Sequence, residues 1–187
     1  MATSKNNVLT HGLSGTVGDL LVFRNKGGKV IVANKPKERT SEYTEGEKAH
    51  QQLFQRATLY GKSVLADPTK KAAYNSAAKD GQSAYNVAVA DYFSAPDIKE
   101  VDLSAYTGAV GSTIKIKAID DFKVAKVFVR IATTDGSLIE EGNAVLQADG
   151  LYWLYTATQL NNSPTGDKIT VTAWDLPNNS AVKEKVL

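Results

Sequence analysis

Three aspartates are the most suggestive material for chemistry in this sequence. Asp120 and Asp121 follow one predicted strand, and Asp175 follows another that should end at the same edge of a two-sheet domain. Carboxylates that converge there with backbone carbonyls could bind a calcium ion. Aspartates in turns more often bond to their own backbone, so Asx turns are the favoured interpretation and a calcium site is the weaker alternative.

The rest of the sequence offers few residues that could form a catalytic site. The chain has no cysteine and two histidines, His11 and His50, which we place in the N-terminal tail and on the exposed side of a helix. They cannot supply a histidine metal site, a catalytic triad or thiol chemistry. The paired acids Glu140 and Glu141 point to opposite faces of a strand and cannot flank one substrate. We therefore expect no enzyme, no catalytic residue and no cofactor.

Glycines at positions 12, 15 and 18 resemble a phosphate-binding loop at first sight. They precede a predicted strand, however, whereas a phosphate loop joins a strand to a helix and ends in Gly-Lys-Ser or Gly-Lys-Thr. We interpret them as a flexible lead into a β-hairpin.

A basic run is the second candidate binding feature. It contains one acid, Glu38, among six cations: Arg24, Lys26, Lys29, Lys35, Lys37 and Arg39. A β-ribbon with arginines and lysines can contact nucleic-acid phosphates, but no aromatic residues are interleaved here to stack on bases. A solvated surface or an acidic protein partner is therefore favoured over nucleic acid.

The basic run lies on a predicted hairpin. Val17–Phe23 and Val30–Ala33 are β-like runs, and residues 24–29, with Gly27 and Gly28, should form the loop between them. Two strands are marginally stable alone and leave edges that can pair with another chain. We therefore predict an assembly interface from the apolar residues of the hairpin: Val17, Leu20, Val22, Phe23, Val30 and Val32.

Helical signals occupy residues 44–95. Thr44 and Glu47 form a capping box, Asp67 and Pro68 open a second helix that stops at Gly81, and a third should run from Ser83 to Phe93. Helical spacing predicts a buried stripe on each: Leu53, Phe54, Ala57, Tyr60, Gly61, Val64 and Leu65 on the first, Ala73, Tyr74, Ala77 and Ala78 on the second, and Tyr85, Ala88, Val89, Tyr92 and Phe93 on the third.

Residues 96–187 alternate apolar and polar residues in short runs between turn signals, which predicts an immunoglobulin-like β-sandwich without a disulfide. The expected strands are Lys99–Leu103, Thr113–Ile119, Ala125–Thr133, Leu138–Val145, Tyr152–Thr158, Lys168–Trp174 and Ala181–Val186. Alternation assigns nine residues to the inner faces: Ile114, Ile116, Ala118, Val127, Val129, Ile131, Ile169, Val171 and Ala173. Phe128 and Trp174 fall on the outer face, where we expect them to contact each other as part of an interface or beneath a neighbouring segment.

The chain is thus expected to have an α+β fold, with a tail, hairpin and linker in residues 1–43, a helical domain in 44–95 and the sandwich in 96–187. Residues 1–95 contain 13 Lys and Arg against 8 Asp and Glu, whereas residues 96–187 contain 9 against 12. Opposite net charges allow a head-to-tail contact between copies.

Several of these segments resemble an uncharacterised protein family common in Bacteroidota. The resemblance lies in Gly15-Thr-Val-Gly-Asp-Leu-Leu-Val-Phe-Arg, Gly28-Lys-Val-Ile-Val and Lys35-Pro36, and continues in Asp67-Pro68 with Tyr74, Ser83-Ala-Tyr-Asn and Asp91-Tyr-Phe. It implies a Gly-rich hairpin, Ala- and Tyr-rich helices and a strand-rich C-terminal half, and it implies no activity.

We expect a structural subunit that self-assembles into a homo-oligomer or polymer through its hairpin. The alternatives are an adaptor that binds another protein or a glycan through the sandwich, and a nucleic-acid-associated protein that uses the basic run. The first residues lack a secretion signal and no apolar run is long enough for a membrane span, so we expect cytoplasmic synthesis without membrane insertion.

Overall fold

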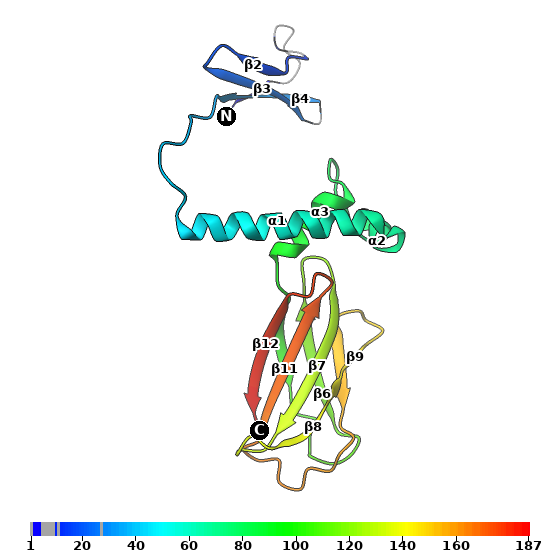
Figure 1. Cartoon of the computed structure of the whole chain (residues 1–187). Helices are drawn as coiled ribbons and strands as arrows, with labels where there is room; N and C mark the ends of the chain where they lie inside the picture. Colours follow the sequence, from blue (N-terminus) through cyan, green and yellow to red (C-terminus); the bar gives the residue numbers. More distant parts are fainter. Residues whose placement is uncertain (1, 5–9, 11, 27) are drawn as a thin grey trace. The chain divides into compact units, whose positions relative to one another are not determined.

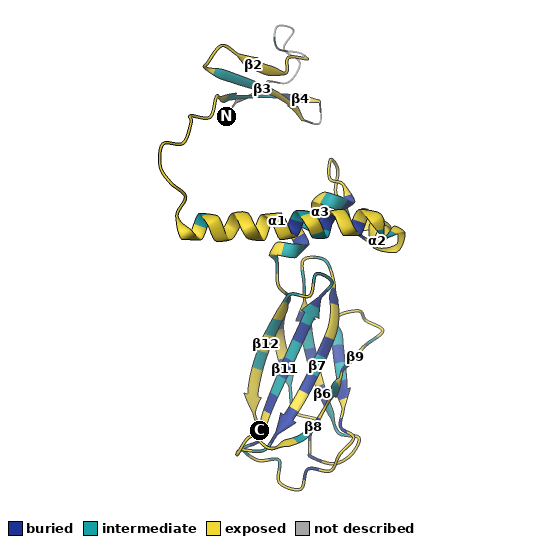
Figure 2. Ribbon diagram, viewed as in Figure 1, coloured by how far each residue is buried: buried dark blue, intermediate teal, exposed yellow. Residues whose placement is uncertain are grey.

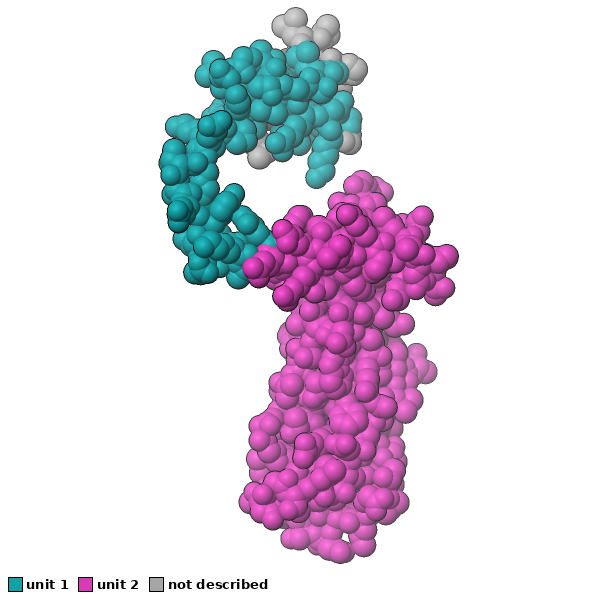
Figure 3. All heavy atoms as spheres, viewed as in Figure 1, with its two compact units in different colours: residues 1–51 teal, residues 52–187 magenta. Residues whose placement is uncertain are grey.

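The computed structural model describes residues 2–4, 10, 12–26 and 28–187 of the chain (Figure 1). His11 and Gly27 lie outside the described residues. The chain divides into two compact units, residues 1–51 and 52–187 (Figure 3). We expected a further division at residue 96, but the second and third helices and all later strands belong to one unit.

The first unit contains a four-stranded antiparallel sheet with the order β1-β4-β3-β2. Its strands are β1 Ala2–Ser4, β2 Gly15–Val17, β3 Leu21–Lys26 and β4 Lys29–Asn34. The single strand expected over Val17–Phe23 is wrong, because a turn at residues 18–20, with Gly18 at φ 55°, divides it. The β3–β4 hairpin is present, but its loop is shorter than predicted and two further strands flank it.

The described residues form three helices, α1 Glu45–Ala66, α2 Pro68–Ala77 and α3 Ala84–Phe93. Each begins at its predicted cap. Glu47 Oε2 accepts from the Thr44 amide at 2.9 Å, Asp67 Oδ1 accepts from the Thr69 amide at 2.9 Å, and Ser83 Oγ accepts from a first-turn amide of α3. None of these helices is both long and apolar enough to cross a membrane.

The buried stripes of the helices are narrower than their apolar spacing predicts. The buried residues are Ala57, Gly61 and Val64 on α1, Tyr74 on α2, and Ala84, Ala88 and Asp91 on α3. The expected core residues Leu53, Phe54, Leu65, Ala73, Ala77 and Phe93 are exposed. Gly61 permits close packing of α1 on α3, because a Cβ there would come within 2.8 Å of the Tyr85 ring.

The helices complete their core with residues from the strand region. We call α2, α3 and residues 57–66 of α1 the helical layer. Val64, Tyr74, Ala84 and Ala88 form its buried cluster, and Phe122 and Leu176 pack against that cluster from the turns after two strands. The helical layer therefore lies on one end of the strand domain (Figure 1) and has no core independent of it.

Two four-stranded antiparallel sheets make up residues 97–187, with the orders β5-β6-β10-β9 and β12-β11-β7-β8. Their strands are β5 Asp97–Asp102, β6 Thr113–Ile119, β7 Val124–Ala132, β8 Leu138–Asn143, β9 Val145–Leu146, β10 Tyr152–Thr156, β11 Lys168–Asp175 and β12 Ser180–Val186. All seven predicted strands are present, and β9 is an addition. The nine predicted inner-face residues are all buried, and burial alternates along β7 and β11 (Figure 2). The α+β class is confirmed. The two sheets share one core, and we call the two sheets together with this core the sandwich.

Two charged side chains, Lys183 and Glu140, link the two sheets of the sandwich. Lys183 on β12 donates through Nζ to the backbone oxygens of Ile98 and Lys99 at 2.9 and 3.0 Å, which ties β12 to β5. Glu140 on β8 is buried and accepts from Thr158 and Gln159 through Oε2, whereas Glu141 is exposed. The prediction that Glu140 and Glu141 face opposite sides is thus confirmed, and Glu140 has a structural contact in the loop after β10.

Candidate functional site

The N-terminal sheet has two chemically different faces. Residues directly opposite each other in an antiparallel pair share a face, so the pairs Phe23 with Val32 and Val17 with Leu21 belong together. That face, which we call the apolar face, contains Val17, Leu21, Phe23, Val30 and Val32 together with Gly15, Asn25 and Asn34. The opposite face, which we call the basic face, contains Thr16, Val22, Arg24, Lys26, Lys29, Ile31 and Ala33.

This register does not place all six predicted interface residues on one face. Val22 lies on the basic face, because it neighbours Phe23 along one strand. Leu20 lies in the turn between β2 and β3 and is 77% exposed, so it belongs to neither face. Leu21 was missed. Alternation from Phe23 would have identified it, had the turn at residues 18–20 been recognised.

Two cations of the basic run form ion pairs, and three others lie together on one face of the sheet. Lys35 forms a 2.6 Å ion pair with Asp19. Arg39 donates to Glu47 through its two terminal guanidinium nitrogens at 2.7 Å and lowers the pKa of that carboxyl to about 2. The remaining strand cations, Arg24, Lys26 and Lys29, share the basic face, and Lys26 lies directly opposite Lys29.

An aromatic pair lies on the outer face of the β12-β11-β7-β8 sheet. The ring centroids of Phe128 and Trp174 are 6.5 Å apart in an edge-on arrangement, which confirms their predicted contact. The Lys126 ammonium lies 5.3 Å from the Phe128 ring and 5.1 Å from the Trp174 ring. The cation therefore covers part of an apolar patch, an arrangement that cation–π attraction stabilises.

The three aspartates of the calcium hypothesis make separate contacts. Asp120 Oδ2 accepts from the amides of Phe122 and Lys123, Asp175 Oδ1 accepts from the Asn179 amide, and Asp121 Oδ2 accepts from the Ser94 hydroxyl. Within the described part of the chain no three acidic or histidine side chains are arranged to hold a metal ion. The Asx-turn interpretation is confirmed for Asp120.

A buried acid that the sequence reasoning missed lies beside this turn. Asp91 on α3 is 2% exposed, and its Oδ2 accepts from the Tyr74 hydroxyl at 2.5 Å, while the Tyr74 and Tyr60 hydroxyls lie 2.8 Å apart. Loss of hydration on burial raises the pKa of Asp91 to about 7. Burial likewise raises the pKa values of Tyr60, Tyr74 and Asp175. The sequence did contain a signal for this buried acid, because Asp91 lies three residues after Ala88 on the apolar stripe of α3.

Asn179 and Ser94 fix the end of α3 to the sandwich. Asn179, in the β11–β12 turn, donates through Nδ2 to the Ser94 backbone oxygen at 2.9 Å and to Asp175 Oδ2 at 2.7 Å. The Ser94 hydroxyl donates to Asp121 in the β6–β7 turn at 2.6 Å. Both turns at this end of the sandwich therefore bind the residue that follows α3.

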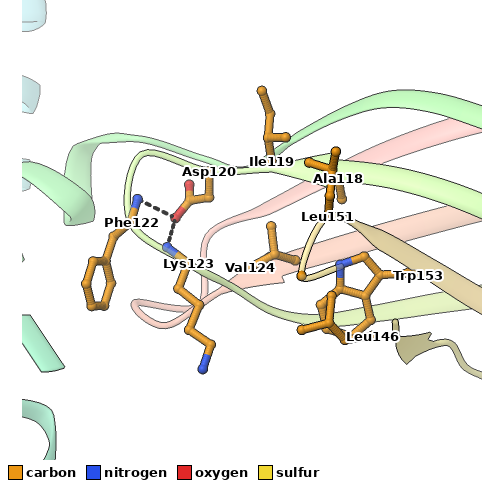
Figure 4. Close-up of a pocket in the computed structure, with 10 residues that line it drawn as sticks. Ala118, Ile119, Asp120, Phe122, Lys123, Val124, Leu146, Leu151 and Trp153 are labelled. Atoms are coloured by element: carbon orange, nitrogen blue, oxygen red, sulfur yellow. Dashed lines mark hydrogen bonds between the residues drawn. The ribbon is translucent and has the colours of Figure 1, made fainter. Parts of the chain in front are cut away.

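A cavity of about 230 Å³ lies on the other side of the β6–β7 turn (Figure 4). Ile119, Leu146, Leu151 and Trp153 supply apolar walls, and Asp120 and Lys123 supply its polar side. Backbone amides of the β6–β7 turn hold Asp120, so the fold of this turn sets the polar side of the cavity.

Comparisons with known proteins identify no family: no family model and no curated protein matches the chain. Among solved structures it is similar to CopC from Methylosinus trichosporium OB3b, with 19% identity and a TM-score of 0.34 over 48% of this chain and 87% of CopC. It is also similar to an engineered protein, with 15% identity and a TM-score of 0.32 over 58% of this chain and 30% of that protein. Scores this low assign neither a fold nor an activity to the chain.

Proposed function

We propose that this protein is a non-enzymatic structural subunit that self-assembles through its N-terminal sheet. The observation that carries the proposal is the amphipathic register of that sheet. A sheet buries its apolar face against another layer, yet Val30, at 5% exposure, is the one buried side chain among the described residues of the first unit. Val17, on the same face, is 57% exposed.

The partner in this proposal is a second copy of the same sheet. Two apolar faces that pack on each other are self-complementary, as a two-fold contact between identical chains requires. Arg24, Lys26 and Lys29 all lie on the opposite face. Face-to-face packing therefore keeps the cations of the two copies apart, whereas contact through the basic faces would bring like charges together.

We further propose that the sandwich is immunoglobulin-like. Its two strand orders support this assignment, since they correspond to the A-B-E-D and G-F-C sheets of that architecture, with β8 added beside the third strand. In this assignment the sandwich offers its outer faces for contacts with other molecules, and the sheet in the first unit joins copies of the chain.

The test is light scattering coupled to size-exclusion chromatography on the full chain. We expect a mass above the 20.1 kDa of one chain that falls on dilution. Phe23→Ser on the apolar face should give the single-chain mass at every concentration. Val22→Ser is the matched control, because it changes the adjacent half-buried residue on the other face and should leave the assembly intact. A wild-type chain that is monomeric throughout contradicts the proposal.

A second candidate function, an adaptor acting through the sandwich, is favoured by the Phe128 and Trp174 pair. A paired aromatic patch on an outer sheet face often marks a protein contact. Trp174→Ser should then leave the mass of the N-terminal assembly unchanged and remove binding of a partner. If Trp174→Ser instead dissociates the assembly, the patch belongs to the contact between copies.

A further inference from the structure

Asp91 is surrounded by groups from every element packed against it. Tyr74 of α2 donates to it, and Tyr60 of α1 follows behind Tyr74. Asp120 of the β6–β7 turn and Asp175 at the end of β11 face it from the sandwich. A neighbouring cavity of about 280 Å³, which Asp91 itself lines, adds Lys79 and Asp121. The junction between the helical layer and the sandwich thus concentrates acids around one buried carboxyl.

Two oxygens at this junction lack an ordinary donor. Oδ1 of Asp91 and Oδ1 of Asp120 are both buried, and neither receives a hydrogen bond from a donor among the described residues. Asp120 is among the groups that raise the pKa of Asp91. A carboxylate has acceptors only, so a buried carboxyl oxygen without a donor favours the protonated acid.

We propose that Asp91 holds a proton at this junction, and that loss of this proton as the pH rises loosens the helical layer from the sandwich. With Asp91 charged, a buried charge without a cationic partner would lie near the carboxyls of Asp120 and Asp175. Separation of α3 from the β6–β7 turn relieves that repulsion, because it lets water reach Asp91. The sandwich core contains none of these acids and stays folded.

The direction of the pH dependence follows from the environment of Asp91. Burial raises its pKa to about 7 from an ordinary value of 3.8. The docked layer therefore binds the proton more tightly than the released layer does. The stabilisation is complete below about pH 4, declines as the pH rises toward 7, and is absent above 7. Asp175, whose pKa burial also raises, changes the balance in the same direction.

Hydrogen exchange on the full chain tests this proposal, with each rate divided by the intrinsic exchange rate at that pH. One proton changes an opening equilibrium about tenfold per pH unit. Protection of the amides in α2 and α3 should therefore fall by up to about 100-fold between pH 5 and pH 8, whereas protection in β7 and β11 should not change. Equal protection of the helices at the two pH values would overturn the proposal.

Asp91→Asn separates the Asp91 proton from general acid effects. Its amide can accept from Tyr74, as the protonated acid does, but it cannot titrate. The variant should keep the helices protected at pH 8 and lose most of their pH dependence, with the remainder due to Asp175. Asp121→Asn is the control, because it changes another acid of the β6–β7 turn, keeps an acceptor for Ser94 and leaves Asp91 unchanged, so its pH dependence should remain.

If Asp91→Asn does not fold, a measurement on the wild-type chain still tests the proposal. The ¹³C shift of the Asp91 carboxyl in the wild-type chain should titrate with a midpoint near 7. A midpoint near 4, or an unchanged pH dependence in Asp91→Asn, refutes the proposed proton on Asp91.

Discussion

Phe122→Ala should release the helical layer while the sandwich stays folded. Phe122 lies in the β6–β7 turn, and its ring stacks on Tyr74 with centroids 4.2 Å apart and planes inclined by 20°. It is half-buried and packs against the cluster of Val64, Tyr74, Ala84 and Ala88. Because this cluster has few members, the loss of one aromatic partner removes a large share of its apolar contacts.

The magnitude follows from the burial of the ring. Truncation of a fully buried Phe to Ala costs about 3–5 kcal/mol, so a half-buried ring accounts for roughly 2 kcal/mol. The lost aromatic pair adds about 0.5 kcal/mol at the low end of such contacts. The opening free energy of the helical layer should therefore fall by about 2.5 kcal/mol, which is a roughly 70-fold increase in the open population.

Hydrogen exchange at one acidic pH, where Asp91 is protonated, measures this effect for each element. Amides of α2 and α3 should exchange roughly 70-fold faster in Phe122→Ala, and those of β7 and β11 at the wild-type rate. Phe128→Ala is the matched control, since Phe128 is also half-buried and paired with an aromatic ring but belongs to neither core cluster. If Phe122→Ala accelerates exchange equally in helices and strands, the helical layer and the sandwich open as one unit and the reasoning fails.

Three further predictions concern separate parts of the chain. Residues 96–187 alone should give a β-type circular dichroism spectrum and unfold cooperatively, because every member of the sandwich core lies within them; a disordered fragment would contradict this. Gly61→Ala should lower the melting temperature, since the 2.8 Å approach to a tyrosine ring outweighs the gain of about 1 kcal/mol in helix propensity, whereas Gly46→Ala, with open space around it, should raise the melting temperature. The first turn of α1 should lose its cap as the pH falls from about 4.5 to about 2, because Arg39 and Thr44 lower the pKa of Glu47 and its contribution is present only above that range; amide shifts that titrate near 4.5 would exclude this cap.

Local signals in the sequence located nearly every helix and strand. Thr44 with Glu47, Asp67 with Pro68, and Ser83 each satisfy orphan amides of a first turn, so the three helix starts needed no tertiary information. Alternation over residues 113–119, 124–132 and 168–175 likewise separated core from surface, because a strand with one buried face can take only one register.

Prediction failed where the decisive neighbour is distant in the chain. The apolar spacing of α1 overestimated its buried stripe, because the helical layer packs on turns that supply Phe122 and Leu176 and not on a broad second layer. Leu20 was predicted within a strand, but the turn at residues 18–20 and the pairing of β2 with β3 place it between strands.

The sequence by itself therefore determined the three helices, the seven predicted strands of the sandwich with their inner faces, and the contact between Phe128 and Trp174. Only the tertiary structure decided that Asp91 is buried and that the second and third helices share a unit with the strands of the sandwich. The physical reason is the separation along the chain between the residues that interact. Caps, turns and alternation depend on residues a few positions apart, whereas the burial of a charge depends on which distant segments pack around it.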